Sequence, residues 1–127
     1  MIFVDTDGLV DILRGHPNAV AWLHSLGNQQ LGVCGLSVME LIAGEPNRRG
    51  VARLQRFTSS FLLYWPDAVD CDRALGWYAK GKFSHGLGIL DALIGATAIG
   101  LSEPLHSFNH KHFQAIPGLT LVAPYAR

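Results

Sequence analysis

The chain has 127 residues, which suits one compact domain, and 49% of them are apolar, enough for a substantial core. Ten basic and ten acidic residues cancel, so net charge gives no support for a nucleic-acid partner, and phosphate contacts would require a local basic patch. The two cysteines, Cys34 and Cys71, form no C-x-x-C motif, which argues against structural zinc and favours a reduced intracellular chain, although their pairing stays open.

The N-terminal residues do not resemble a targeting signal. Met1–Asp5 has no basic stretch and only a short apolar run. No apolar run approaches the roughly 20 residues that span a bilayer. We therefore expect a cytoplasmic protein without a membrane segment.

Apolar runs and helix-breaking residues divide the chain into alternating strands and helices. In chain order we predict a strand at 2–4, helices at 6–14 and 17–27, a strand at 31–34, helices at 37–44 and 48–60, a strand at 61–64, a helix at 67–79, a loop at 81–88, a helix at 89–99, and strands at 104–107 and 119–122. The helix at 89–99 is apolar nearly all round, which is typical of a buried helix. The alternation indicates an α/β domain over residues 1–127, with a mostly parallel central sheet of about five strands flanked by helices.

A polar residue directly follows each of four apolar stretches: Asp5, Glu40, Asp91 and Asn109. Asp5 and Asn109 follow predicted strands, and Glu40 and Asp91 lie in the first turns of predicted helices. Ligands of parallel sheets bind beyond the carboxyl ends of the strands, so we expect these side chains to converge. Carboxylates beside a core are costly unless compensated, and two charges about 4 Å apart repel by roughly 4 kcal/mol at an effective dielectric near 20. The pattern therefore predicts a site for Mg²⁺ or Mn²⁺ and phosphodiester chemistry.

Four segments carry a family resemblance: Val4–Asp7, Ser37–Leu41, Leu90–Ala98 and Ser107–Phe113. Together they resemble the motifs of PIN domains, specifically VapC-type toxins of bacterial toxin–antitoxin pairs. Their order and spacing cover essentially the whole chain, and the segment with Asp91 is the most specific.

The resemblance implies a PIN-like fold and a Mg²⁺- or Mn²⁺-dependent endoribonuclease that cuts RNA with an activated water. It assigns metal binding or water activation to Asp5, Glu40 and Asp91, and supporting contacts to Thr6, Ser107 and Asn109. It also implies a homodimer and a VapB-type antitoxin, whose basic side chain can compete with the metal at the acidic site. Two residues depart from the family pattern, because many members have Asp at the position of Asn109 and Thr at that of Ser107.

Each acidic residue also has a purely structural interpretation. Asp5 is a good N-cap for the following helix. Ser37-x-x-Glu40 matches a capping box. Asp91 can be a first-turn acid favoured by the helix dipole, typically worth 0.3–1 kcal/mol. Asp7 and Asp11 are expected to be solvated helix residues, with Asp7 as an alternative outer-shell acid.

Several basic residues are candidate contacts for RNA phosphates, with a solvated surface as the alternative. The arginines follow a helical spacing, and the lysines border predicted active-site loops. The candidates are Arg48, Arg49, Arg53, Arg56, Lys80, Lys82 and Lys111.

Two rival functions stay open at the level of the sequence. Asp5-Thr6-Asp7-Gly8 resembles the opening motif of haloacid-dehalogenase-like phosphatases, in which Asp5 would be the nucleophile and Asp7 a general acid–base. However, the later acidic pair of that family is not evident. Alternatively, with Asn109 in place of an acid, the domain binds RNA or a protein without turnover.

The predicted N-terminal helices carry many apolar residues for a small domain. If one sheet face cannot cover them all, the remainder forms a groove for an amphipathic antitoxin helix. Otherwise, all of them pack inside the monomer. The residues are Leu9, Val10, Ile12, Leu13, Val20, Trp22, Leu23, Leu26, Leu41 and Ile42.

Overall fold

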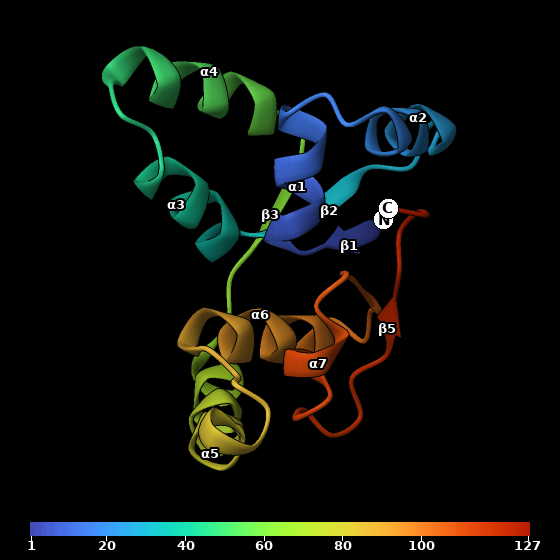
Figure 1. Cartoon of the computed structure of the whole chain (residues 1–127). Helices are drawn as coiled ribbons and strands as arrows, with labels where there is room; N and C mark the ends of the chain where they lie inside the picture. Colours follow the sequence, from blue (N-terminus) through green and yellow to red (C-terminus); the bar gives the residue numbers. More distant parts are fainter.

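A five-stranded parallel sheet lies between two layers of helices in the computed structural model, which describes residues 1–127 (Figure 1). The strands are β1 (Ile2–Val4), β2 (Leu31–Cys34), β3 (Leu62–Tyr64), β4 (Leu105–His106) and β5 (Leu121–Val122). The helices are α1 (Thr6–Leu13), α2 (Pro17–Ser25), α3 (Gly35–Ala43), α4 (Arg48–Thr58), α5 (Ala68–Ser84), α6 (Ile89–Gly100) and α7 (His110–Phe113). The predicted α/β class and the five-stranded sheet are confirmed.

The strand order is β3-β2-β1-β4-β5, with every neighbouring pair parallel. From the central strand β1, the chain goes to β2 on one side and later returns to β4 on the other. This change of direction opens a crevice beyond the carboxyl ends of β1 and β4, where α/β sheets commonly bind ligands.

The core has two parts, one on each face of the sheet, because neighbouring side chains of a strand point to opposite faces. Phe3 packs with Cys34, Leu105 and the buried side of α6 in one cluster. Val4 packs with residues such as Leu9 from α1 in the other cluster. In Figure 1, α1, α2 and α4 accordingly lie on one side of the sheet, and α5, α6 and α7 lie on the other.

The loop predicted over residues 81–88 is wrong in its first half, because α5 continues to Ser84. Gly81 lies inside the helix, where the lack of a side chain allows close packing. A Cβ on Gly81 would lie 2.8 Å from the Cβ of Ala115 and 3.1 Å from Leu87. The left-handed backbone of Gly86, with φ +66°, follows the end of the helix.

Two further features differ from the prediction. The four-residue helix α7 is too short to show a helical repeat in the sequence, and the burial of Phe113 holds it against the core. Helix α3 begins at Gly35 and not at Ser37. None of the helices combines the length and the apolar character needed to cross a membrane.

Candidate active site

Asp5 combines a structural role with a place in the crevice. It follows β1, is only 5% exposed, and caps α1 by accepting a 2.8 Å hydrogen bond from the Thr6 N–H at Oδ1. Its other oxygen, Oδ2, accepts a 2.9 Å hydrogen bond from the Ser107 hydroxyl at the end of β4. The predicted N-cap is therefore present, and the same carboxylate lies between the two strand ends that form the crevice.

The environment of Asp5 disfavours its charged form. The pKa of Asp5 is raised to about 7, mainly by burial and further by the negative charges of Asp7 and Asp91. The hydrogen bonds from Ser107 and Thr6 act in the opposite direction but do not cancel it. Asp5 therefore lacks the positive charge that its ionised form requires.

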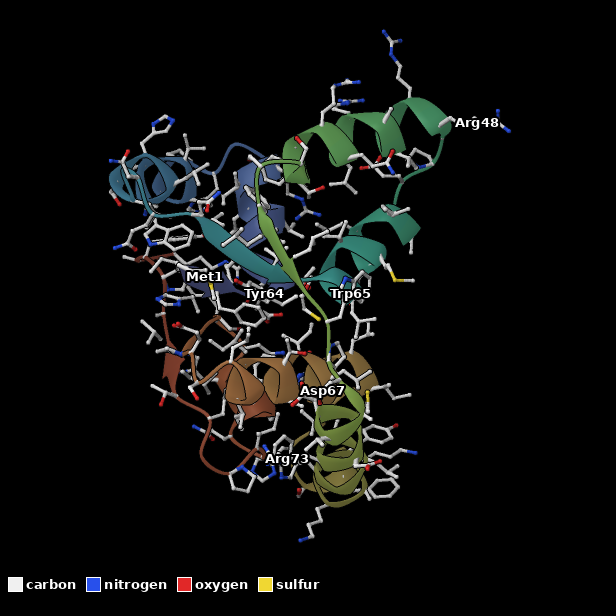
Figure 2. The ribbon with its side chains drawn as sticks, turned by 180° about the vertical axis from the view of Figure 1, so that it is seen from behind. Met1, Arg48, Tyr64, Trp65, Asp67 and Arg73 are labelled. Atoms are coloured by element: carbon white, nitrogen blue, oxygen red, sulfur yellow. The ribbon has the colours of Figure 1, made fainter.

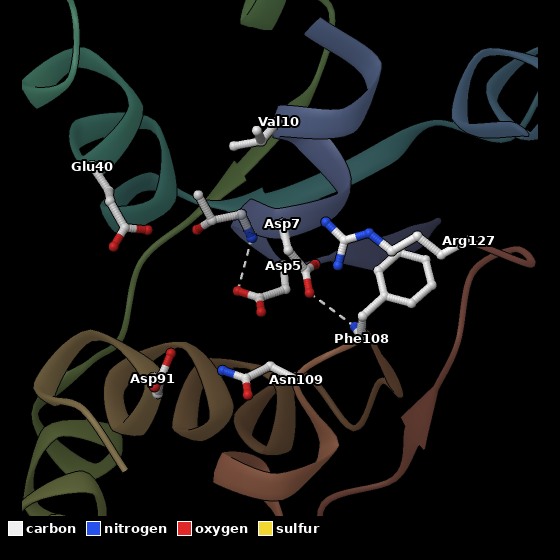
Figure 3. Close-up of a pocket in the computed structure, with 9 residues that line it drawn as sticks. Asp5, Asp7, Val10, Glu40, Asp91, Phe108, Asn109 and Arg127 are labelled. Carbon is white, nitrogen blue, oxygen red and sulfur yellow. Dashed lines mark hydrogen bonds between the residues drawn. The ribbon is translucent and has the colours of Figure 1, made fainter. Parts of the chain in front are cut away.

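Glu40 and Asp91 approach the same space from two helices. Glu40 projects from α3 and is exposed. Asp91 lies in the first turn of α6, where Oδ2 accepts a 3.2 Å hydrogen bond from the Gly88 N–H and lies 3.5 Å from Nδ1 of His112. Figure 3 shows the carboxylates of Asp5, Glu40 and Asp91 directed toward a common space.

The capping box considered as a structural alternative for Ser37 and Glu40 is not formed. Because α3 starts earlier, Cys34 is its N-cap and Ser37 is a fully buried residue inside the helix. The Ser37 hydroxyl has no hydrogen-bond partner. Glu40 is consequently free of the capping role that was its strongest structural alternative.

These side chains line a pocket of about 480 Å³ at the carboxyl end of the sheet (Figure 3). The pocket-lining residues are Asp5, Thr6, Asp7, Val10, Glu40, Asp91, Phe108, Asn109 and Arg127. Five of the six predicted catalytic and supporting residues are among them. The sixth, Ser107, is fully buried and hydrogen-bonds to Asp5.

Asn109 belongs to a small polar network on the α7 side of the pocket. Its amide Nδ2 lies 2.9 Å from Nδ1 of His112, which also contacts Asp91. Its backbone N–H donates a 3.0 Å hydrogen bond to the Ser107 hydroxyl oxygen. Asn109 thus connects two residues that contact the carboxylates Asp5 and Asp91.

The expectation that Asp7 and Asp11 are ordinary solvated residues is wrong. Asp7 accepts hydrogen bonds from the backbone N–H of Phe108 at 2.9 Å and from the Ser107 hydroxyl at 3.2 Å. Asp11 is 6% exposed and binds residues of the C-terminal segment. Their partners lie about 100 or more residues away in sequence, so local helix patterns could not reveal them.

Arg127, Phe108 and Val10 also line the pocket without having been predicted as site residues. Arg127 is 49% exposed and forms an ion pair with Asp11. Neither Phe108, within a matched motif, nor Val10, within a helical repeat, carried a signal for this role. A single basic residue after the last strand likewise carries no sequence signal for a place in the site.

The seven basic residues predicted as RNA contacts are all exposed, but none lines the pocket. The four arginines lie on α4, on the far side of α3 from the pocket (Figure 1). Lys80 and Lys82 lie within α5 and not beside a loop as expected. Contact between these seven side chains and RNA therefore stays a prediction, because none of them belongs to the pocket lining.

The donor set of the pocket fits a hard divalent cation. It consists of carboxylate and amide oxygens, which Mg²⁺ and Mn²⁺ prefer, and a bound cation would compensate the ionised form of Asp5. No three His, Cys, Asp or Glu side chains are gathered closely enough to form a ready-made metal cluster. Because Mg²⁺ usually keeps several waters and binds only one or two carboxylates directly, it does not require such a cluster.

A second pocket, of about 440 Å³, adjoins the acidic one and shares Thr6, Val10 and Glu40 with it. We call it the α1–α3 groove, and its apolar residues are Val10, Leu13 and Leu41. Leu13 is 40% exposed. A groove thus exists in the expected region, although other predicted groove residues pack inside, among them Leu9 and Ile12.

More strongly exposed apolar side chains lie outside the predicted groove residues. They gather on α5 and the start of α6, where a small pocket has a wholly apolar lining. The exposed apolar residues of these two helices are Val69, Leu75, Phe83 and Ile89, of which Leu75 and Ile89 line the small pocket.

Comparison with protein families places residues 2–119 within the model of the PIN domain. Ribonuclease VapC19 of Mycobacterium tuberculosis is 32% identical over 124 residues, which cover 94% of this chain and 97% of that protein.

Solved structures show the same similarity. A toxin–antitoxin complex from Klebsiella pneumoniae matches with a TM-score of 0.79 and 25% identity, over 100% of both chains. VapBC-1 from nontypeable Haemophilus influenzae matches with a TM-score of 0.77 and 25% identity, over 98% of both chains. VapBC2 from Rickettsia felis, bound to a DNA fragment from its promoter, matches with a TM-score of 0.74 and 26% identity, over 96% of this chain and 98% of that one.

Proposed function

The chain belongs to the PIN domain family, and from this premise we propose that it is an endoribonuclease, the toxin of a VapBC-type toxin–antitoxin pair. The observation that carries the proposal is the convergence of Asp5, Glu40 and Asp91 on one pocket, in a chain 32% identical to a VapC ribonuclease. Family membership also favours this activity over the phosphatase alternative.

We assign the binding of Mg²⁺ or Mn²⁺ to Asp5, Glu40 and Asp91. When bound, such a cation supplies Lewis acidity that activates water and offsets the charge of the scissile phosphate. The surplus of carboxylates in the pocket and the raised pKa of Asp5 support this assignment.

The residues of the chain have distinct tasks in this proposal. The Thr6 N–H and the Ser107 hydroxyl hold both oxygens of Asp5 in place, and the Gly88 N–H holds Asp91. Positioned carboxylates of this kind can accept the proton of the attacking water. Water attacks directly, so no covalent bond forms between the chain and the RNA.

The decisive experiment compares the wild type with Asp91→Asn in RNA cleavage with Mg²⁺ or Mn²⁺. We expect cleavage by the wild type and its loss in the folded variant, because the variant loses one carboxylate charge while the amide oxygen can still accept from Gly88. Asp72→Asn, at an exposed position of α5 outside the pocket, is the matched control and should retain activity.

This experiment and one further assay separate the alternatives. RNA binding without cleavage by the wild type would favour a non-enzymatic binding domain. A covalent aspartyl-phosphate detected with a phosphomonoester substrate would favour the phosphatase mechanism. Full activity of folded Asp91→Asn would remove Asp91 from the mechanism.

We assign the α1–α3 groove to a VapB-type antitoxin. Its apolar residues offer a surface for an amphipathic helix, and the groove runs into the acidic pocket. A basic side chain from the antitoxin can therefore reach the carboxylates.

The test is co-expression with a candidate VapB-type antitoxin, followed by co-purification of the complex. Leu13→Glu should disrupt the complex, because it places a charge among apolar groove residues. Val122→Glu, at a 37% exposed position of β5 outside the groove, is the control and should leave the complex intact.

We also assign the homodimer implied by the family to the apolar surface of α5 and α6. Its support is the group of exposed apolar side chains that includes Leu75 and Ile89. Leu75→Glu should convert a dimer to a monomer in light scattering. A wild-type monomer would contradict the assignment.

A further inference from the structure

The segment after β5 is fastened across the first two helices. The Tyr125 hydroxyl donates a 2.7 Å hydrogen bond to Oδ2 of Asp11, and Asn18 donates one of 2.6 Å to the carbonyl of Ala126. The Tyr125 ring packs against Trp22, with ring centroids 5.7 Å apart. These contacts fix the chain immediately before Arg127.

The guanidinium of Arg127 is held on two sides at the rim of the acidic pocket. Its Nε and Nη2 lie 3.1 Å from the two oxygens of Asp11, in a bidentate pair. Its carbon lies 4.7 Å from the centre of the Phe108 ring, which itself packs against Tyr125 at 4.9 Å. Figure 3 shows the guanidinium of Arg127 beside Asp7.

Part of the guanidinium remains available to a ligand. A guanidinium carries five N–H donors, and the Asp11 contacts use only the edge formed by Nε and Nη2. Nη1 has no hydrogen-bond partner, and the side chain is 49% exposed.

The neighbouring carboxylate of Asp7 does not accept a hydrogen bond from the free N–H groups of Arg127. Oδ1 of Asp7 accepts from the Gly8 N–H at 2.7 Å, and Oδ2 accepts from the Phe108 N–H at 2.9 Å and the Ser107 hydroxyl at 3.2 Å. No hydrogen bond or ion pair joins Arg127 to Asp7; burial raises the pKa of Asp7, and the positive charge of Arg127 only partly offsets this rise.

Arg127 is also the only positively charged side chain of the pocket lining, against four carboxylates. Among the side chains of the pocket lining, only Arg127 can therefore offer a positive charge to a backbone phosphate. An arginine fixed in orientation, with free donors, suits the planar recognition of phosphate.

From these observations we infer that Arg127 is a substrate-positioning residue, whose guanidinium binds a backbone phosphate of the RNA while Asp11 and Phe108 hold it in place. This inference rests on the proposed RNA substrate. It adds a contact made by the C-terminal segment of the chain itself.

The test measures RNA binding without turnover, in the Asp91→Asn background with Mg²⁺. A fluorescein-labelled single-stranded RNA of mixed sequence is titrated over a series of salt concentrations. Arg127→Gln should weaken binding about tenfold, the order expected for a lost charged hydrogen bond, and lower the log–log salt slope by roughly 0.7. Arg73→Gln removes the same charge from the exposed side of α5 (Figure 2) and should change neither value.

Arg127→Lys separates position from charge. It keeps the charge but cannot keep the bidentate contact with Asp11. We expect the salt slope to be retained and the affinity to fall by less than in Arg127→Gln. When the Arg127 substitutions are made in the wild-type chain, which keeps Asp91, KM for RNA cleavage should rise more than kcat falls.

The outcomes distinguish this inference from the proposed function. If the wild type cleaves RNA while both Arg127 variants bind like the Asp91→Asn parent, the inference is overturned and the function stands. If the variants show the expected losses but the wild type never cleaves, the function fails and the phosphate contact stands. If the Asp91→Asn protein itself does not bind RNA, the inference is overturned. Should Arg127→Gln fail to fold, the RNA affinity of Arg127→Lys decides: weaker binding than the parent supports the inference, and equal binding overturns it.

Discussion

Ser107 donates a buried 2.9 Å hydrogen bond to Oδ2 of Asp5, joining the carboxyl ends of β4 and β1. The same hydroxyl lies 3.2 Å from Oδ2 of Asp7. A serine hydroxyl has one proton, so two carboxylates compete for it.

Removing this hydroxyl should raise the pKa of Asp5 above its value of about 7, because the hydrogen bond from Ser107 favours the charged carboxylate. The change is Ser107→Ala, and the measurement is a carbon-detected NMR titration of the Asp5 carboxyl. Ser107→Thr keeps a hydroxyl and should keep the pKa close to wild type. An unchanged pKa in Ser107→Ala would show that the contact does not govern the ionisation of Asp5.

The metal-free protein should become less stable as the pH rises from about 4 to about 7. The pKa of Asp5 is raised on folding from 3.8 to about 7, so in this range the folded state binds more protons than the unfolded state, and rising pH favours unfolding. The corresponding free energy is on the order of 4 kcal/mol. The pKa of Asp7 is also raised, so Asp7 adds to the loss of stability with rising pH. The pKa of Asp11 is lowered, so Asp11 affects the pH dependence only at pH values below the ordinary pKa of an aspartate.

The measurement is urea unfolding between pH 4 and 7.5, with Asp5→Asn as the comparison. Asparagine is also a good N-cap, so the variant should be more stable than wild type at pH 7.5, and the difference in stability should shrink toward pH 4. Added Mg²⁺ should restore wild-type stability at the higher pH, because a ligand of the folded state stabilises it. Equal pH dependence of both proteins would contradict the role of Asp5.

Asn109→Asp should tighten divalent-metal binding. The substitution adds a negative charge to a residue that lines the pocket, and a carboxylate attracts a cation more strongly than an amide does. Isothermal titration with Mn²⁺ measures the change. Gln114→Glu adds the same charge at an exposed position just after α7 and serves as the control. Equal affinity of Asn109→Asp and wild type would place this position outside the reach of the ion.

Replacing the arginines of α4 tests whether this helix contributes to RNA binding. Arg49, Arg53 and Arg56 recur at helical spacing, and Arg48 lies at the outer end of the helix (Figure 2). A variant with all four changed to Gln should bind single-stranded RNA more weakly, and each lost phosphate contact should lower the log–log salt slope by roughly 0.7. Binding is compared with Arg73→Gln. A slope equal to wild type would make these arginines ordinary surface residues.

Much of the site could be predicted because its signals are local. Asp5, Glu40, Asp91 and Asn109 each follow an apolar stretch, and parallel strands bring such positions to one edge of the sheet. All four line the acidic pocket. Their roles in metal binding and catalysis stay predictions.

The remaining parts depend on contacts between distant segments. The burial of Asp11 arises from Tyr125 and Arg127, more than 100 residues away. The continuation of α5 through Gly81 depends on packing against Ala115. Neither relationship leaves a periodic or compositional signal in the sequence, so each side chain appears ordinary until the fold is complete.

The pairing of β1 with β4 also sets the order in which activity can appear during synthesis. Asp5 emerges from the ribosome first, but its partner Ser107 lies 102 residues later. Loops of this length close late in folding relative to local helices. A nascent chain that stops before β4 has neither this support for Asp5 nor the α7 side of the pocket, so interrupted translation yields a fragment without an assembled active site.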